Sequence, residues 1–153
     1  MNRLRSFVRL LRRDSRGATV VEFALLAPVF MSVLIGVFET GIYMQNYNAV
    51  RNVAADAARF AAVEYQKNNQ LGTEDLKLNI ETIAQQSPYN LSPNRLQVTV
   101  TPVLSRVVGA KEFNLQVKYT PPGFMEGLGM DGFNLSYSRP LFVLDNTYIP
   151  PAP

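Results

Sequence analysis

Residues 16–44 read RGATVVEFALLAPVFMSVLIGVFETGIYM, and this stretch decides the fold. Its central run, from Phe23 to Phe38, contains no charged residue. An α-helix rises about 1.5 Å per residue, so the apolar stretch from Val20 to Met44 is long enough to cross a bilayer core about 30 Å thick. The sequence therefore predicts one transmembrane helix.

Basic residues gather in front of this helix. Six of the chain's 15 Lys and Arg residues lie within the first 16 positions, and a single acidic residue there, Asp14, opposes them. They are Arg3, Arg5, Arg9, Arg12, Arg13 and Arg16. The rest of the chain has nine basic residues against eleven acidic ones, so the pI of about 9.3 belongs to the leader and predicts no nucleic-acid partner. The positive-inside tendency places the N-terminus in the cytoplasm and the remainder across the membrane.

An ordinary secretory signal peptide also begins with basic residues and an apolar core. Its cleavage site would follow the apolar run and would need small residues there. This run instead continues through Glu39, Thr40, Gly41 and Tyr43 without an Ala-x-Ala pattern. We therefore expect the apolar helix to be retained.

The helical pattern continues beyond the membrane stretch. Apolar residues recur at helical spacing, and no Gly or Pro interrupts them after Gly41. They are Val50, Val53, Ala54, Ala57, Ala58, Ala61, Ala62 and Tyr65. The pattern predicts one helix from Ala18 to about Lys67, with a kink at Pro28, whose ring removes a backbone hydrogen bond.

A second helix and a sheet follow. The polar break Asn68–Gln70 and Gly72 predict a helix stop, and Thr73 is a candidate cap for a helix that ends at Ser87 and Pro88. The apolar stripe of that helix is Leu76, Ile80, Ile83 and Ala84. From residue 95 the apolar period becomes two, which predicts strands at 96–100, 113–119 and 133–137, and a short fourth one at 141–144. A Gly-rich loop at 121–132 precedes the third.

These patterns predict an α+β fold, in which a long transmembrane helix extends into a small head with a second helix and an antiparallel sheet of three to four strands. We divide the chain into a basic leader (1–17), a transmembrane stem (18–44), an extracytoplasmic continuation of the stem helix (45–67), an α+β head (68–147) and a Pro-rich tail (148–153).

Composition limits the chemistry. The chain has no His, Cys or Trp, which excludes disulfides, thiolate zinc sites and His-containing triads. The spacing of Glu126, Asp131 and Asp145 matches no calcium loop or paired-carboxylate pattern, so we interpret them as solvated loop residues rather than a metal or catalytic cluster. We expect no cofactor and no enzymatic activity.

Glu22 is the residue of greatest interest in the stem. A carboxylate at the centre of a bilayer costs about 2.5–3.5 kcal/mol on insertion scales, and less near the interface, so it invites a specific partner. Cleavage between Gly17 and Ala18 would create an α-ammonium group four residues, or one helical turn, before Glu22. Pairing with its own or a neighbour's terminus would fix the axial register of packed stems, because a slipped neighbour leaves charges unpaired. The simpler interpretation is a carboxylate that marks the membrane edge.

The order of these features resembles the TadE-like minor pilins, or pseudopilins, of the tight-adherence (Tad/Flp) type IV pilus system. The basic leader, Gly17, Ala18, Glu22, Phe23 and the Ala-Leu-Leu-Ala-Pro run at 24–28 carry the resemblance, which covers about the first third of the chain. It implies cleavage after Gly17 by a prepilin peptidase and a role for Glu22 and Phe23 in subunit assembly. Phe23, where major Flp pilins usually have Tyr, and the large C-terminal region favour the minor class.

The resemblance implies a subunit that initiates or caps a Tad/Flp pilus for surface adherence. Its implied partners are the prepilin peptidase, other pilin and pseudopilin subunits, the inner-membrane assembly platform and the lipid bilayer. The implied location is the cytoplasmic (inner) membrane, with entry into a cell-surface pilus left open. Two alternatives stay open: an uncleaved, signal-anchored envelope scaffold of a secretion or pilus machine, and a secreted enzyme or binding module held by its anchor.

Several other residues have two interpretations. Glu39 is expected to mark the outer membrane boundary. Ala54, Ala58 and Ala62 recur at every fourth position, which fits either close helix–helix packing or a small stripe against the head's own sheet.

Two further groups belong to the helix continuation and the head. Arg51, Asp56 and Arg59 are expected on a solvated or intersubunit face. The aromatic residues Phe113, Tyr119, Phe133 and Tyr137 are expected in the core or on the surface of the sheet, with some of them available to neighbouring subunits.

Overall fold

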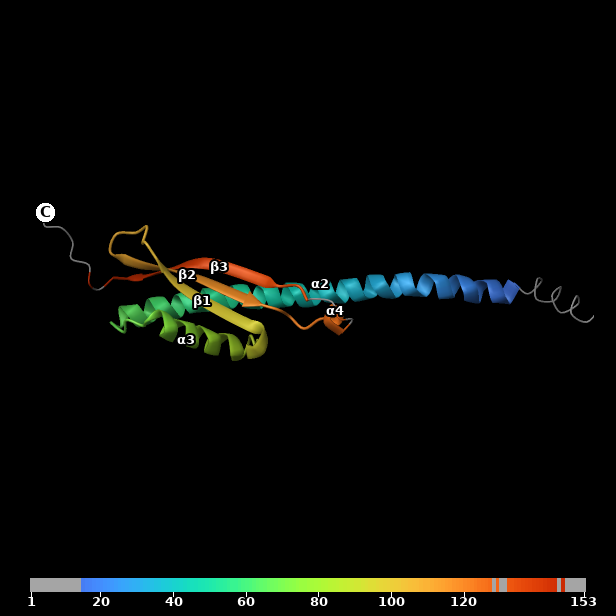
Figure 1. The fold of residues 1–153 in the computed structure, drawn as a ribbon, viewed down its shortest axis with the longest axis horizontal. Helices are drawn as coiled ribbons and strands as arrows, with labels where there is room; N and C mark the ends of the chain where they lie inside the picture. Colours follow the sequence, from blue (N-terminus) through green and yellow to red (C-terminus); the bar gives the residue numbers. More distant parts are fainter. Residues whose placement is uncertain (1–14, 128, 130–131, 146, 148–153) are drawn as a thin grey trace, which may run out of the picture. The chain divides into compact units, whose positions relative to one another are not determined.

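The computed structural model describes residues 15–127, 129, 132–145 and 147, without the side chains of Ser15, Arg16 and Met125. Its elements are α2 (Ser15–Gln66), α3 (Thr73–Gln85), the 3-10 turn η1 (Pro93–Arg95), β1 (Leu96–Val103), β2 (Ala110–Tyr119), α4 (Phe124–Gly127) and β3 (Leu135–Leu144) (Figure 1). The predicted α+β fold with a long apolar N-terminal helix is confirmed. Most of the predicted leader and the Pro-rich tail lie outside the described residues.

The chain forms two compact units, which divide between Thr40 and Gly41. Helix α2 contributes to both, and Pro28 lies inside it. The first unit consists, over its described residues, of the N-terminal part of α2. The second holds the rest of α2 together with the head.

The end of α2 differs in detail from the prediction. Asn68, rather than Gly72, takes the left-handed conformation that closes the helix, with a φ of 64°. The amide of Asn69 donates to Glu64 O at 3.0 Å and that of Asn68 to Tyr65 O at 3.1 Å, the two bonds of a Schellman cap. Asparagine tolerates this conformation better than most residues because its short polar side chain bonds locally.

The start of α3 also differs from the prediction. Its N-cap residue is Gly72, not Thr73. The Gly72 amide donates to the Asp75 carboxylate at 3.4 Å, which is the half of a capping box that requires no side chain at the N-cap residue. Leu76, Ile80 and Ala84 face the core, as the periodicity predicts.

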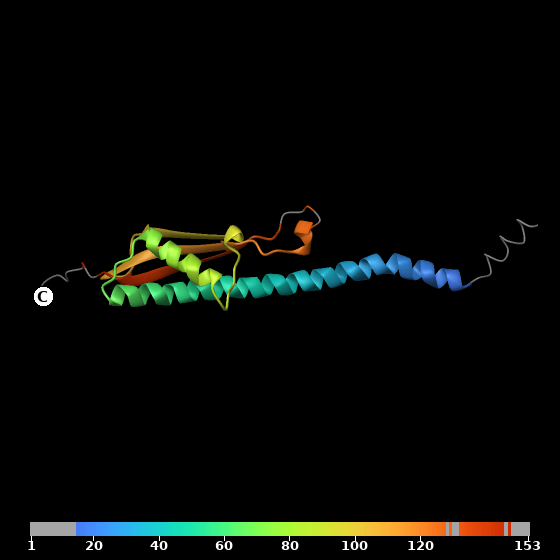
Figure 2. The ribbon, with the colours of Figure 1, turned by 90° about the horizontal axis from the view of Figure 1, so that it is seen from below.

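The sheet is antiparallel, in the order β1-β2-β3. The register pairs Val98 with Val117 and Val117 with Tyr137, which places alternate apolar side chains of all three strands on one face. Figure 2 shows the second part of α2 running along one side of this sheet. One core joins Val50, Val53, Ala54, Ala57, Ala61 and Tyr65 of α2 with the apolar stripe of α3 and the inner face of the sheet.

The predicted third and fourth strands are one continuous strand, β3, despite Pro140. The Asp145 amide donates to Gly109 O. Because backbone hydrogen bonds in an antiparallel pair recur at every second residue, the odd-numbered residues of β3 direct their N–H and C=O groups toward β2. Pro140 is out of phase with them, and its nitrogen faces the outer side of an edge strand, where no ladder bond is lost. The same holds at the other edge of the sheet. The Thr120 amide donates to Arg95 O, so the odd-numbered residues of β1 bond to β2 and the nitrogen of Pro102 faces the outer side of β1.

Candidate assembly stem and the head that carries it

The four predicted site residues lie together in the first turns of α2. The helix begins at Ser15, so the bond between Gly17 and Ala18 lies within its first turn. Gly17, Ala18, Glu22 and Phe23 are all exposed in the single chain, Phe23 by 73 %. A Cβ added at Gly17 would meet no atom within 4 Å, so nothing described in this chain requires a glycine there.

The apolar side chains of the stem are uncovered. Large residues on every side of the helix between Val20 and Phe38 are exposed, among them Leu25 at 71 % and Phe38 at 72 %. Within the described residues this is the one helix long and apolar enough to cross a membrane, with a mean hydropathy of 2.3 over its best window. A helix that is apolar all round requires an apolar surrounding, and the finding indicates membrane anchoring.

The hydroxyl groups of the stem find acceptors in their own helix. Ser32 Oγ donates to Pro28 O at 2.7 Å, and Thr40 Oγ1 donates to Gly36 O at 2.8 Å. Both groups are therefore satisfied before the helix meets lipid or another helix. Glu22 differs: among the described residues it has no side-chain hydrogen bond and no ion pair. Glu39 is half-buried on the same helix.

The alanine stripe packs within its own chain. Ala54 is fully buried and Ala58 is partly buried against the core of the head, while Ala62 is half-exposed. For Ala54 and Ala58 the structure therefore favours packing within the chain's own head over packing against another helix. Their small side chains let α2 lie close to the rest of the core.

Asp56 also belongs to the intramolecular contacts of α2. Tyr89, in the loop after α3, donates its hydroxyl to Asp56 Oδ2 at 2.6 Å. This hydrogen bond to a carboxylate, with burial adding to it, raises the pKa of Tyr89 to about 12. Arg51 and Arg59 are exposed, in keeping with the expected solvated or intersubunit face.

The acidic loop residues do not converge. Glu126 forms a two-pronged ion pair with Arg95, at 2.9 and 3.0 Å, and Asp145 lies 3.6 Å from Lys111 Nζ. Each carboxyl group has a lowered pKa, caused by hydrogen bonds from Arg95 in the first case and chiefly from Thr147 in the second. Asp131 lies outside the described residues. Within the described part of the chain, no three acidic residues come together as a metal site.

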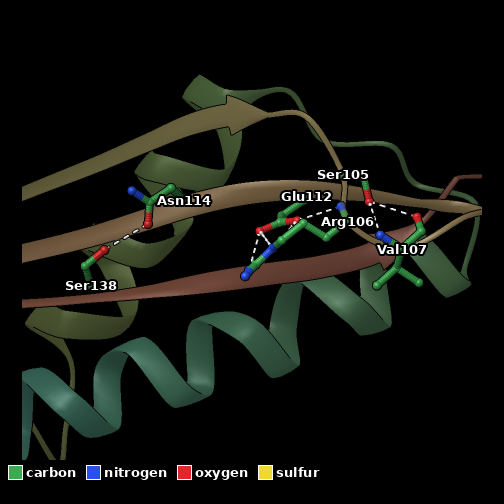
Figure 3. Close-up of polar contacts among 6 residues, drawn as sticks. All are labelled: Ser105, Arg106, Val107, Glu112, Asn114 and Ser138. Carbon is green, nitrogen blue, oxygen red and sulfur yellow. Dashed lines mark hydrogen bonds and ion pairs between the residues drawn. The ribbon is translucent and has the colours of Figure 1, made fainter.

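One ion pair was not predicted from the sequence. Arg106, in the loop between β1 and β2, binds the carboxylate of the buried Glu112 with its guanidinium, at 2.6 Å from Nη2, and with its backbone amide at 3.0 Å (Figure 3). The guanidinium also lies 5.5 Å from the centre of the Phe142 ring. Hydrogen bonds from Arg106 lower the pKa of Glu112. The sequence signal that could have predicted this pair is the placement of opposite charges, Arg106 and Glu112, on the two sides of the turn between β1 and β2.

The aromatic residues of the head divide into two groups. Phe113 and Tyr119 are buried and Tyr137 is partly buried against the core, as expected for a sheet. Phe133 is 62 % exposed, and its ring meets the ring of Tyr43 edge to face, with centroids 6.3 Å apart.

Comparison with known proteins supports the resemblance seen in the sequence. Residues 17–59 match the family model described as TadE-like protein, a segment that begins at Gly17 and contains Ala18, Glu22 and Phe23. The match is consistent with a TadE-like protein of the Tad pilus system, and it supports a pilus-associated, pilin-like protein that associates with pilus subunits and machinery. No curated protein and no solved structure matches the chain significantly.

Proposed function

We propose that this TadE-like chain is a minor pilin, or pseudopilin, that takes part in the initiation or capping of a Tad/Flp pilus. It is inserted in the cytoplasmic membrane with its N-terminus inside and its head outside, and a prepilin peptidase cuts it after Gly17. Its stem then packs among those of other pilin subunits at the assembly platform. Its role is structural rather than enzymatic, and the pilus serves surface adherence.

One observation carries the proposal. Glu22 is an exposed carboxylate without an ion pair in the described chain, on a helix whose surroundings are otherwise apolar, one turn after the Gly17–Ala18 bond. In low dielectric such a group stays ionised only when a cation lies beside it, and otherwise takes up a proton. Proteolysis at Gly17 supplies that cation as the α-ammonium group of Ala18, either in the same chain or in a neighbour. The start of the family match at residue 17 agrees with this boundary.

The processing step is tested by mass spectrometry of full-length protein extracted from membranes of cells with and without the prepilin peptidase. We expect a chain that begins at Ala18 only when the peptidase is present. A chain that keeps Met1 in both strains would reject processing and favour the uncleaved envelope scaffold. Gly17→Val serves as a probe of recognition, because a Cβ at position 17 would meet no described atom within 4 Å.

The assembly step is tested with Glu22→Ala. We expect normal cleavage after Gly17 but strongly reduced recovery of the subunit in pilus fractions or minor-pilin complexes, because the terminal ammonium of a neighbour then lacks its partner. Glu39→Gln is the matched control, since it removes a carboxylate from the same helix farther from the cleavage site. Normal incorporation of Glu22→Ala, or an equal loss in Glu39→Gln, would reject the proposed charge pairing.

A further inference from the structure

A small cluster of aromatic side chains lies at one end of the head. The ring of Phe133 meets that of Tyr43 at 6.3 Å with an interplanar angle of 83°, and Tyr43 stacks on Tyr47 at 6.5 Å and 6°. These three residues are called the aromatic cluster below. Phe133 is 62 % exposed and Tyr43 is 37 % exposed, whereas Tyr47 is partly buried against the core, so the cluster leads from the edge of the core to the surface of the head.

The cluster joins the linker between β2 and β3 to the last residues of the apolar stretch. Tyr43 lies between Ile42 and Met44, which are 37 % and 54 % exposed and end the apolar run along the chain. The linker leaves the sheet where Tyr119 pairs with Leu135, and its short helix α4 lies beyond that end of the strands (Figures 1 and 2). The contact with Tyr43 places Phe133 beside the last residues of the apolar stretch.

The described carboxylate of the linker is paired with a cation. Glu126 is the acidic side chain among the described residues of the linker, and both of its oxygens bind the guanidinium of Arg95. A paired carboxylate loses less on approach to a region of low dielectric than a free one does. Among the described residues of the linker, the single carboxylate is therefore paired, while the exposed cation at this end of the sheet is Lys118, one residue before the end of β2.

From this combination we infer that the aromatic cluster rests on the outer surface of the lipid bilayer, so that Phe133, just before β3, is a second membrane contact beside the stem. Tyr suits this position because its ring favours the boundary between lipid tails and head groups while its hydroxyl remains in water, and the exposed ring of Phe133 gains by leaving water for the adjoining apolar layer. The contact would limit tilting of the head while the subunit is stored in the membrane. The inference rests on the membrane anchorage in the proposed function.

The exposed apolar residues at the other end of the sheet do not share this arrangement. Leu104 and Val108, in the loop between β1 and β2, are 95 % and 80 % exposed. They follow β1 rather than the apolar stretch, and the cation of Arg106 lies in the same loop. Nothing connects them along the chain to the stem, so they provide a comparison site with similar side chains and no expected lipid contact.

The chain has no Trp, so a single introduced Trp reports its own surroundings without background. We would place full-length Phe133→Trp in nanodiscs made with lipids that carry bromine near the head groups. Bromine quenches a nearby indole, and a ring at position 133 can keep its contact with Tyr43. Leu104→Trp serves as the exposed apolar control, and Phe30→Trp, in the middle of the apolar stretch, reports insertion of the stem itself.

We expect the Phe133→Trp protein to lose most of its fluorescence in brominated lipid and the Leu104→Trp protein to keep its own. A solvent-like, unquenched signal at position 133 together with quenching of Phe30→Trp by deeper bromines would overturn the inference and leave the anchorage intact. A blue-shifted signal at position 133 that bromine does not reach and that changes with protein density would also overturn it, in favour of a protein neighbour. Absence of quenching at both positions 30 and 133 would reject the anchorage as well.

Discussion

The two parts of helix α2 have similar apolar content but different surroundings. Between residues 17 and 40 large side chains point in every direction and remain exposed, as Phe23 and Leu25 do. Between residues 41 and 66 one face consists mostly of small residues, such as Val53 and Ala57, and packs into the core of the head. Hydrophobicity alone therefore does not say where a helix is buried. The size and placement of the side chains show that the second part fits its own head, while the first part needs lipid or other stems.

The largest effect is expected from the same substitution made in each part. Ala57→Leu adds three carbon atoms to a closed core and should lower the free energy of unfolding by about 1–3 kcal/mol through overpacking. Ala24→Leu adds the same atoms to the exposed stem and should change it little. Denaturant titration of the full-length protein in detergent, followed by near-ultraviolet circular dichroism of the tyrosines, measures both. An equal decrease in the free energy of unfolding for Ala57→Leu and Ala24→Leu would contradict the difference in packing between the two parts of α2.

A smaller effect is expected from the ion pair that holds the hairpin loop between β1 and β2. The pKa of Glu112 is lowered from its usual 4.5 by hydrogen bonds from Arg106, so the charged carboxylate is favoured in the folded state. Its contribution to stability is thus present above the unfolded pKa and is lost as the pH falls through the lower, folded pKa. Hydrogen exchange measures this effect. After correction for intrinsic rates, the amides of the hairpin loop, residues 104–109, should exchange faster in acid than at neutral pH.

Two variants separate the roles of individual carboxylates in that experiment. Glu112→Gln should open the hairpin loop at neutral pH and remove most of the acid dependence, since no carboxylate there is left to protonate. Glu126→Gln, which breaks the other Arg-paired carboxylate, should leave the hairpin loop unchanged. Equal hydrogen-exchange rates of the loop amides in the unaltered protein, Glu112→Gln and Glu126→Gln would show that the Arg106–Glu112 pair does not hold the loop.

The smallest effect is expected where the loop after α3 meets the second part of α2. Tyr89→Phe removes the hydroxyl that bonds to Asp56 and should lower the free energy of unfolding by about 0.5–1.5 kcal/mol. The pKa of Tyr89 is raised from 10.0 to about 12, so this contribution is complete below pH 10 and is lost as the pH rises toward 12. Ultraviolet titration of tyrosinate checks it: one late-titrating tyrosine should disappear in Tyr89→Phe and titrate earlier in Asp56→Asn.

The sequence predicted the fold where periodicity and composition agree. The apolar run, the stripe of α3 and the alternation in β1 and β2 depend on local spacing, and the structure has all of them. The errors occur where a long-range contact decides. The separate third and fourth strands were predicted because the place of Pro140 at the sheet edge is unknown from the sequence. The end of α2 is a local exception: Asn68 closes the helix because its side chain tolerates a positive φ as a glycine does.

The candidate site shows the same division. Gly17, Ala18, Glu22 and Phe23 follow from a linear order of residues, so the sequence alone identifies them, but their function stays a prediction because it depends on other molecules. The Arg106–Glu112 pair and the contact of Phe133 with Tyr43 depend on how distant segments meet. No local pattern encodes the distance between residues 43 and 133, so that contact required the structure.

The two outward-facing prolines have a consequence for crowding. A membrane confines its proteins to a plane, where neighbouring heads collide repeatedly and an open sheet edge can recruit the edge of the next molecule. Pro102 and Pro140 each remove an amide from the side at which such an addition would begin. For the membrane-anchored subunit proposed above, we therefore expect neighbouring heads to resist pairing by their strands, which leaves contact between subunits to the surfaces of the helices.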